Sequence, residues 1–338
     1  MEYFSLKSRY YYTRLSDSEK KIYRQIYSCW ETGGNVATIE LPGTEFTVPG
    51  GKDLHQIILF IIGDNPQLFH LETTQLRYRR SGTTVTIEAE QVYPEAEYKA
   101  LYAQLIDQVK HIVNQANQYK TDLEKLRFLH DYLSENILYN WGESDPKSQR
   151  EVHTIVGALL KKSCVCDGYA RAFRLLCDYL NLSCIIVGGV NKQPDNIGPH
   201  SWNCVKIDNQ VYHVDVTWDS NLVANGCPIT DYYFLRSDAV FLRDHAWDQE
   251  LYPPCPKDYP RREPVIASKW ELEQYLCDQF KAGHATILVQ MDCNSPGLET
   301  LQRFVGEIIQ RNPEVFAKVR YSYTTYQESI NYAEVHFE

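Results

Sequence analysis

One part of the chain predicts a helix followed by a β-hairpin. Apolar residues recur at spacings of three and four over residues 167–180, which is typical of a helix with one buried face. Residues 200–207 and 210–217 are rich in β-branched and aromatic residues, and Asp208-Asn209 between them favours a two-residue hairpin turn. This region therefore predicts helices packed with antiparallel strands, an α+β arrangement.

A cysteine, a histidine and an aspartate follow one another in this region. Cys166 would begin the helix, where free backbone N–H groups and the helix dipole favour a thiolate. If Ile207 pairs with Gln210, His200 and Asp215 become diagonal neighbours on one face, with Cβ atoms about 6–8 Å apart. That spacing allows a hydrogen bond. The chemistry indicates a nucleophile, Cys166, a general base, His200, and a carboxylate that orients the imidazole, Asp215.

A thiol that attacks a carbonyl also needs donors for the oxyanion that forms. The Cys166 backbone N–H is the first candidate. Tyr139 and Trp141, which follow a predicted helix, are candidates for a side-chain donor. Two other residues are alternatives to Asp215 as the orienting group. Asp219 ranks second, and Asn203 ranks third because its spacing puts it on the strand face opposite the histidine.

Three short stretches resemble the transglutaminase-like superfamily, which shares the papain-like thiol protease fold. They are Val-Cys-Asp-Gly-Tyr-Ala at 165–170, His-Ser-Trp-Asn at 200–203 and Val-Asp-Val-Thr-Trp-Asp at 214–219. The resemblance covers about residues 100–255 and implies catalytic roles for Cys166, His200 and Asp215. There is one departure: bacterial members commonly have glycine two residues before the nucleophile, where this chain has Cys164.

The resemblance implies a thiol acyl-transfer enzyme that acts on a peptide or protein substrate. The acyl-enzyme could be resolved by water, as in a peptidase or amidase, or by an amine, as in a transglutaminase. We expect hydrolysis, because an unshielded thioester meets water far more often than a specific amine. The rival interpretation is a non-catalytic binding or scaffold protein that retains the fold.

Three regions are expected along the chain. They are an N-terminal accessory region at 1–94, the catalytic domain at 95–255 and a C-terminal α/β domain at 262–338. The proline-rich stretch 252–260 is the expected linker, because it cannot form a regular helix or a central strand. From residue 263 onward the pattern predicts strand, helix, strand, helix, strand, strand, which is typical of a small α/β sandwich.

Composition and charge exclude several classes of function. The net charge of −10 disfavours nucleic acid or an anionic membrane as the main partner. The longest apolar run, residues 57–62, is too short to span a bilayer, and the start of the chain lacks a signal-peptide pattern. We expect a cytoplasmic protein, although a chain trimmed of an export signal would look the same. The oligomeric state stays open.

No cofactor and no metal site are expected. The chain has ten cysteines, and we expect most of them to be reduced and structural. Cys164 and Cys166 form a Cys-x-Cys pair, which lacks the usual spacing of a structural zinc site. His130 is expected to be structural, and His213 to be an exposed or packing residue.

Overall fold

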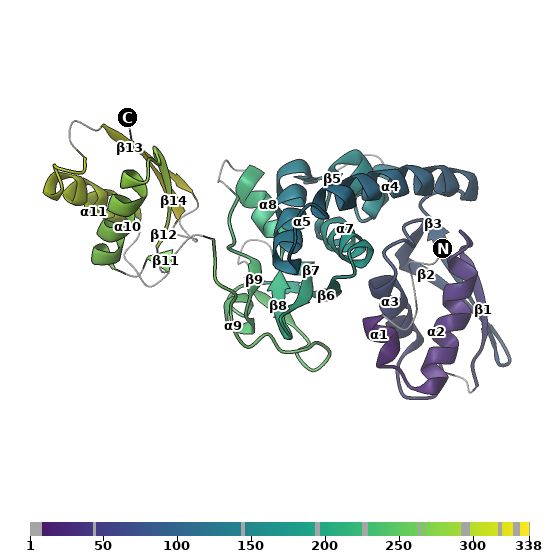
Figure 1. Ribbon diagram of the computed structural model, residues 1–338. Coiled ribbons are helices and arrows are strands. Elements are labelled where there is room, and N and C mark those ends of the chain that lie inside the picture. Colours follow the sequence, from purple (N-terminus) through teal and green to yellow (C-terminus); the bar gives the residue numbers. More distant parts are fainter. Residues whose placement is uncertain are drawn as a thin grey trace. The chain divides into compact units, whose positions relative to one another are not determined.

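The computed structural model describes most of the chain (Figure 1). The described residues are 9–42, 45–142, 146–192, 197–224, 229–262, 265–266, 268–291, 298–316, 320–326 and 332–337. The chain divides into two compact units, one of Met1–Asn221 with Tyr233–Tyr259 and one of Leu222–Tyr232 with Pro260–Glu338. The first unit contains the expected accessory region together with most of the expected catalytic domain. The division into three regions stays a prediction.

The N-terminal region packs helices against a small sheet. Its helices are α1 (Tyr10–Thr13), α2 (Asp17–Trp30) and α3 (Leu54–Asp64), and its antiparallel sheet has the order β1-β3-β2, with β1 (Val36–Glu40), β2 (Leu71–Ser81) and β3 (Thr84–Gln91). A capping box begins α2, in which Ser16 accepts from the Glu19 backbone and the Glu19 side chain accepts in return. The face of α2 that carries Ile22, Ile26 and Trp30 is buried.

The following region combines helices with a five-stranded antiparallel sheet. Before the sheet come α4 (Glu95–Ala116), α5 (Asp122–Asn136), β4 (Leu138–Tyr139), α6 (Pro146–Glu151), the π-helix η2 (Gly157–Lys161), β5 (Ser163–Cys164) and α7 (Cys166–Tyr179). The sheet and its connections are β6 (Ser183–Asn191), β7 (Gly198–Ile207), β8 (Gln210–Val214), α8 (Val216–Ala224), β9 (Phe234–Arg236), α9 (Asp238–Phe241) and β10 (His245–Trp247), with strand order β10-β6-β7-β8-β9. Helices α5 and α7 share one apolar core with β7, which includes Leu129, Phe173 and Val205.

The hairpin of β7 and β8 has the predicted register at its turn but not at its far end. Ile207 pairs with Gln210, and Asp208 and Asn209 have φ angles of 49° and 62°, as a type I′ turn requires. However, β8 ends at Val214, so the strand predicted to continue to residue 217 is wrong. Asp215 instead caps α8, because its Oδ1 accepts from the Trp218 backbone at 3.2 Å.

The second compact unit has the predicted order of elements. These are β11 (Val265–Ile266), α10 (Lys269–Lys281), β12 (Thr286–Met291), α11 (Leu298–Arg311), β13 (Tyr321–Tyr326) and β14 (Tyr332–Phe337), with sheet order β11-β12-β14-β13. Both helices bury apolar side chains with the sheet, among them Leu276, Val289, Val305 and Val335. The fold of the chain is therefore α+β, as expected.

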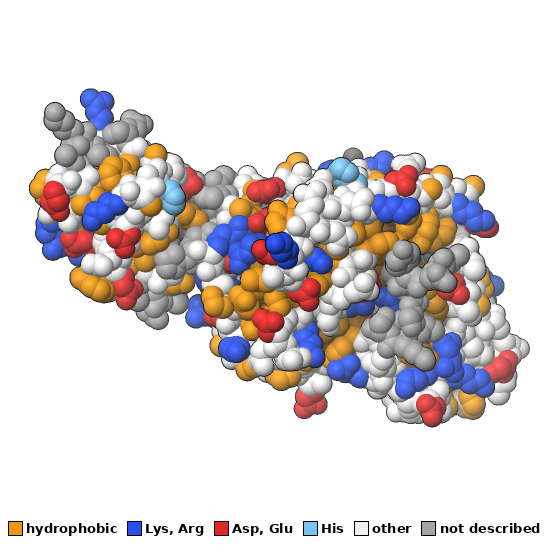
Figure 2. All heavy atoms as spheres, viewed as in Figure 1, with side chains coloured by type: hydrophobic (Ala, Val, Ile, Leu, Met, Phe, Trp, Pro, Cys, Tyr) orange, Lys and Arg blue, Asp and Glu red, His pale blue; other side chains and the backbone are white. Residues whose placement is uncertain are grey.

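The surface carries charges of both signs. Figure 2 shows lysine and arginine side chains interspersed with aspartate and glutamate over the visible face. No helix among the described residues is long and apolar enough to cross a membrane.

Candidate active site

Cys166 is the first residue of α7. The residue before it, Val165, has an extended backbone and makes no side-chain capping hydrogen bond, so no capping side chain covers the backbone N–H groups of the first turn. Gly168 in that turn makes room for Cys164, since a Cβ at Gly168 would lie 2.5 Å from the Cys164 Cβ. Cys164 is fully buried, whereas Cys166 is partly exposed. Cys166 is therefore the accessible thiol of the pair.

The surroundings of Cys166 differ from the expected thiolate site. Burial, and then the charge of Asp167, raise the pKa of the Cys166 thiol, while a hydrogen bond from the Ser201 backbone lowers it by less. The Asp167 carboxylate lies 3.7 Å from the Cys166 sulfur. The helix start alone favours an anion, but an adjacent carboxylate in a buried site disfavours one. Burial and Asp167 therefore favour the protonated thiol, whereas the helix start and the backbone hydrogen bond from Ser201 favour the thiolate, and the thiolate stays a prediction.

His200 and Asp215 meet as predicted. The His200 Nε2 lies 2.7 Å from Asp215 Oδ2, and both side chains are buried. Burial opposes ionisation of Asp215, but the interactions with His200 and with a second histidine, His245, together outweigh it and hold the pKa of that carboxyl well below its usual range. The rings of Trp202 and Trp218 lie 5.8 and 5.4 Å from the His200 ring. The pair is thus shielded from water, and the His200 Nδ1 stays available.

Cys166 lies beside this pair without a direct bond to it. The sulfur contacts Asp167 and the backbone of Ser201, which directly follows His200 in β7. No hydrogen bond joins the Cys166 sulfur to the His200 ring in the described part of the chain. Catalytic hydrogen bonds are often long or poorly aligned before substrate binds. The missing bond between Cys166 and His200 is therefore compatible with a nucleophile and its base.

The two side-chain candidates for the oxyanion site lie in different surroundings. Tyr139 is half-buried, and burial, followed by the charges of Cys166 and Asp167, raises its pKa to about 12, so its phenol lies near the thiol and stays protonated. Trp141 is 79% exposed, and its ring contacts the Tyr139 ring at a tilt of 56°, with ring centroids 4.6 Å apart. Both assignments stay predictions.

The two alternative orienting residues have other partners. Asp219 is buried and accepts from His130 Nε2 at 2.9 Å and from the Tyr233 backbone. Asn203 donates to the Ala170 carbonyl at 3.0 Å, on the side of the sheet that faces α7. His130 is fully buried between two carboxylates, in keeping with the structural role expected for it.

A second histidine on Asp215 was not predicted from the sequence. The His245 Nε2 lies 3.1 Å from Asp215 Oδ2, and its Nδ1 lies 2.6 Å from Asp244 Oδ1. His245 reaches this place because β10 pairs with β6 at the edge of the sheet. No motif or periodic spacing in the sequence marks this residue.

Two groups of potential metal ligands occur among the described residues. They are Cys204, His213 and Cys255, and His200, Asp215 and His245. In the second group, both imidazoles bond the same carboxylate oxygen, Asp215 Oδ2. This arrangement fits a hydrogen-bonded pair on one carboxylate.

The surroundings of His213 differ in part from what the sequence predicted. His213 is fully buried, so of the two expected alternatives the exposed residue is wrong and the packing residue agrees with the structure. Trp202 Nε1 donates to His213 Nδ1 at 2.9 Å, and Asp238 lies 2.9 Å from the other ring nitrogen. Because an indole N–H can only donate, it occupies the lone pair that a metal would need. The Cys204 and Cys255 sulfurs lie 3.9 Å apart beside the ring. The group fits a hydrogen-bonded cluster better than a metal site.

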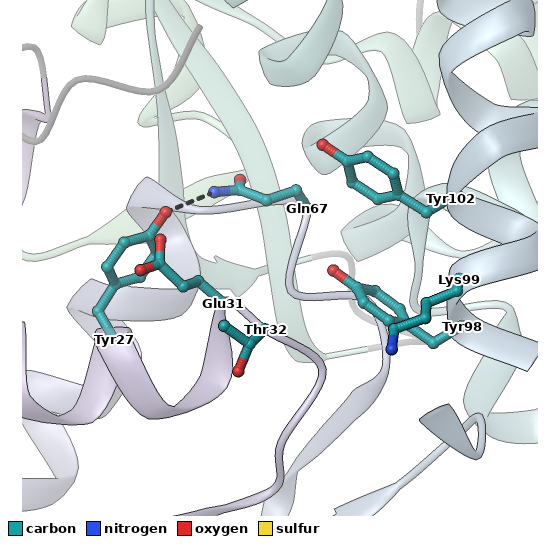
Figure 3. Close-up of a pocket in the computed structure, with 7 residues that line it drawn as sticks. All are labelled: Tyr27, Glu31, Thr32, Gln67, Tyr98, Lys99 and Tyr102. Atoms are coloured by element: carbon teal, nitrogen blue, oxygen red, sulfur yellow. Dashed lines mark hydrogen bonds between the residues drawn. The ribbon is translucent and has the colours of Figure 1, made fainter. Parts of the chain in front are cut away.

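Several cavities occur in the described part of the first unit. One, of about 650 Å³, lies between the N-terminal region and the start of α7, and we call it the cleft. Another, of about 400 Å³, is lined by tyrosines from α2 and α4 and by four polar residues, as Figure 3 shows: Tyr27, Tyr98, Tyr102, Glu31, Thr32, Gln67 and Lys99. Only the cleft contains residues that adjoin Cys166 and His200.

Comparisons with known proteins agree with the geometry. The profile of the transglutaminase-like superfamily matches residues 110–216, which contain Cys166, His200 and Asp215. A comparison with curated proteins finds no match.

Three solved structures are similar in part. One is a crystal structure of a TGase (14% identity, TM-score 0.30, 44% of this chain and 45% of that chain). Another is "a Putative Cysteine Protease from Cytophaga hutchinsonii" (12% identity, TM-score 0.29, 42% and 61%). A third is "a putative protease from Parabacteroides distasonis ATCC 8503" (11% identity, TM-score 0.25, 41% and 35%). The chain spans less than two thirds of each of these chains. On the match over residues 110–216, the chain carries a core of the transglutaminase-like superfamily.

Proposed function

We propose that this protein transfers the acyl group of peptide or amide substrates through the Cys166 thiol, with His200 as the base and Asp215 as the orienting carboxylate. The observation that carries the proposal is the buried bond of 2.7 Å between His200 Nε2 and Asp215 Oδ2. It sets the tautomer that places the proton on Nε2 and the lone pair on Nδ1. That lone pair is the base that a protonated thiol requires.

The first half of the reaction forms an acyl-enzyme. The Cys166 sulfur attacks the carbonyl carbon while His200 Nδ1 takes the thiol proton. The carbonyl oxygen becomes an oxyanion near the first turn of α7, where the Cys166 backbone N–H can donate to it. The C–N bond then breaks, and His200 returns the proton to the leaving amine. Because burial and Asp167 raise the thiol pKa, attack and proton transfer occur together rather than from a resting thiolate.

The second half releases the acyl group. A water molecule attacks the thioester, His200 takes one of its protons, and the sulfur leaves as a thiol when it regains that proton. An amine in place of water would give transamidation by the same steps. We propose hydrolysis, hence a peptidase or amidase, because water is present at far higher concentration than any amine acceptor.

A substrate screen tests the proposal directly. The wild-type protein and the Cys166→Ala variant are incubated with a library of fluorogenic peptide amides, with and without a primary amine. Turnover by the wild-type protein alone, with an acyl adduct on Cys166 in intact-mass spectra, is the expected result. Incorporation of the amine would change the reaction class to transfer. Equal turnover by Cys166→Ala would overturn the proposal.

The raised thiol pKa also suits the rival, a non-catalytic binding or scaffold protein of the same fold. Alkylation with iodoacetamide separates the two. An active-site thiol should be modified at Cys166 well before the buried cysteines, and peptide substrate should protect it. Uniform slow modification of several cysteines, without protection, would favour the scaffold.

A further inference from the structure

The cleft adjoins the proposed active site along α7. Two of its lining residues, Asp167 and Ser201, directly follow Cys166 and His200. The Ser201 hydroxyl donates to Asp167 Oδ1 at 3.1 Å, so α7 and β7 form one continuous wall. Its volume of about 650 Å³ suits a ligand of several residues. The inference that follows rests on the proposed function, because it takes the cleft as the path of the substrate.

The N-terminal region supplies the opposite wall. Figure 1 shows α1 and α3 next to β6, and α3 contacts that strand. The Tyr11 hydroxyl donates to the Ile186 carbonyl at 2.6 Å, and Arg9 pairs with Asp178 of α7 at 2.9 Å. Both Tyr11 and Arg9 are buried. These contacts attach the region to the core, so this wall of the cleft is held in place by buried polar contacts.

The walls of the cleft are mainly apolar. Leu59 of α3 lines it with a side chain that is 50% exposed, opposite core residues that include Ile186 and Leu251. Covering the exposed half of this leucine removes apolar surface from water and so favours an apolar partner. The substrate that fits this wall carries a bulky apolar side chain.

The paired groups of the cleft do not include Arg171 in the described part of the chain. The Arg171 guanidinium makes no hydrogen bond or ion pair within 4.0 Å in the described part of the chain, and only a longer-range charge interaction with Asp167. Asp167 is already engaged, because its two oxygens accept from Ser201 at 3.1 Å and face His153 Nδ1 at 3.3 Å. A planar guanidinium with free donors recognises a carboxylate better than any other group.

The position of Arg171 sets the place of that carboxylate. Arg171 lies five residues after Cys166 in α7, which corresponds to a rise of about 7.5 Å. An extended peptide spans about 3.3–3.6 Å per residue. We propose that the cleft binds an extended peptide whose carboxylate pairs with Arg171 about two or three residues from the scissile amide, with a bulky apolar side chain against Leu59. The carboxylate is either an acidic side chain or the end of the peptide.

Matched peptides test the charge preference. Fluorogenic peptides carry glutamate, glutamine or lysine at each of three positions on either side of the scissile bond, with a free or an amidated C-terminus. The wild-type protein should prefer one acidic position, or the free C-terminus, by about tenfold or more in kcat/KM. Arg171→Gln should remove this preference, and Arg171→Glu should shift it to lysine. Arg77→Gln, with a side chain 73% exposed on β2, is the control and should leave it unchanged.

A second variant tests the apolar wall. Leu59→Ser should raise KM about tenfold for the peptide with the bulky side chain and leave the melting temperature unchanged, because the residue is half exposed. Leu242→Ser, at another exposed leucine, is the control. An unchanged KM in Leu59→Ser would remove this wall from the substrate path.

A binding assay tests peptide recognition by the cleft separately from catalysis at Cys166. Binding of the same labelled peptides to Cys166→Ala, followed by fluorescence anisotropy, needs no turnover. Glutamate-dependent binding that Arg171→Gln abolishes supports the cleft even if no peptide is cleaved, in which case only the proposed function fails. Turnover with no difference between glutamate and glutamine peptides, in rate or in binding, would overturn the inference and leave the proposed function standing.

Discussion

His245 Nε2 lies 3.1 Å from Oδ2 of Asp215, the same oxygen that accepts from His200. Asp215 therefore holds two imidazoles through one atom while its other oxygen caps α8. Burial lowers the pKa of His245, but Asp215 and Asp244 outweigh it and raise that pKa. This second hydrogen-bond donor helps to keep Asp215 ionised and fixed in the position that orients His200.

Replacement of His245 should weaken activity by moving Asp215. Loss of a hydrogen bond to a charged group costs about 1.5–3 kcal/mol, so His245→Leu should lower kcat about 10- to 100-fold. The pKa of Asp215 rises when this donor is lost, so the acid limb of the kcat/KM profile should move to higher pH. His245→Gln keeps an N–H donor and should retain more activity. Equal loss in both variants, with an unmoved acid limb, would indicate a purely structural role.

Asp215→Asn should lower turnover by about 10³–10⁴-fold, because an amide can hold the imidazole in the unproductive tautomer. Single-turnover kinetics with a fluorogenic amide measure the effect. Asp219→Asn is the control: it disturbs the bond of 2.9 Å to His130 and should lower the melting temperature more than the rate. If Asp219→Asn or Asn203→Ala removes activity and Asp215→Asn does not, the assignment of the orienting residue is wrong.

The two neighbouring thiols should behave differently. Cys166→Ala should abolish turnover and leave the melting temperature nearly unchanged. Cys164→Ala should retain most activity, because burial raises the pKa of the Cys164 thiol and its side chain fills the space above Gly168. Activity assays and thermal melts of both variants measure this. An active Cys166→Ala protein beside an inactive Cys164→Ala protein would reverse the assignment.

The His130–Asp219 pair should make stability depend on pH. Burial lowers the pKa of His130, but hydrogen bonds to Asp131 and Asp219 outweigh it and raise that pKa to about 9. A histidine whose pKa is raised on folding stabilises the folded state at pH values below its unfolded pKa of about 6.5. This stabilisation is lost as the pH rises to about 9. The free energy of unfolding should fall by up to about 3 kcal/mol more in the wild-type protein than in His130→Gln over this window.

Urea unfolding at several pH values between about 6 and 10 measures this difference. His111→Gln, at an exposed histidine of α4, is the matched control and should follow the wild-type curve. Parallel curves for the wild-type protein and His130→Gln would show that the buried pair does not gain a proton on folding.

Strong chelators should change neither melting temperature nor activity. One group of potential metal ligands among the described residues is Cys204, His213 and Cys255, and there the Trp202 N–H donates to the His213 Nδ1 at 2.9 Å. Elemental analysis of the purified protein checks this prediction. Stoichiometric zinc that is lost together with stability would contradict it and would show that a metal replaces the Trp202 N–H at His213 Nδ1.

Local patterns in the sequence predicted most of the elements. The apolar spacing over residues 167–180 marks α7, and Asp208-Asn209 marks the hairpin turn with its register at Ile207 and Gln210. These features depend on residues a few positions apart, so the sequence carries them directly. The same is true of the Cys166, His200 and Asp215 motifs, which predict a site but not its electrostatics.

Tertiary structure decided the rest. The rise in the pKa of Cys166 depends on how deeply the thiol is buried and on the nearby Asp167 charge. His245 reaches Asp215 only because β10 joins the edge of the sheet beside β6, an order that no spacing encodes. Cys255, in a stretch expected to be a linker, lies beside Cys204 although 51 residues separate them. Such contacts depend on strand order and packing over the whole fold, whereas periodicity and turn chemistry report only on neighbours along the chain.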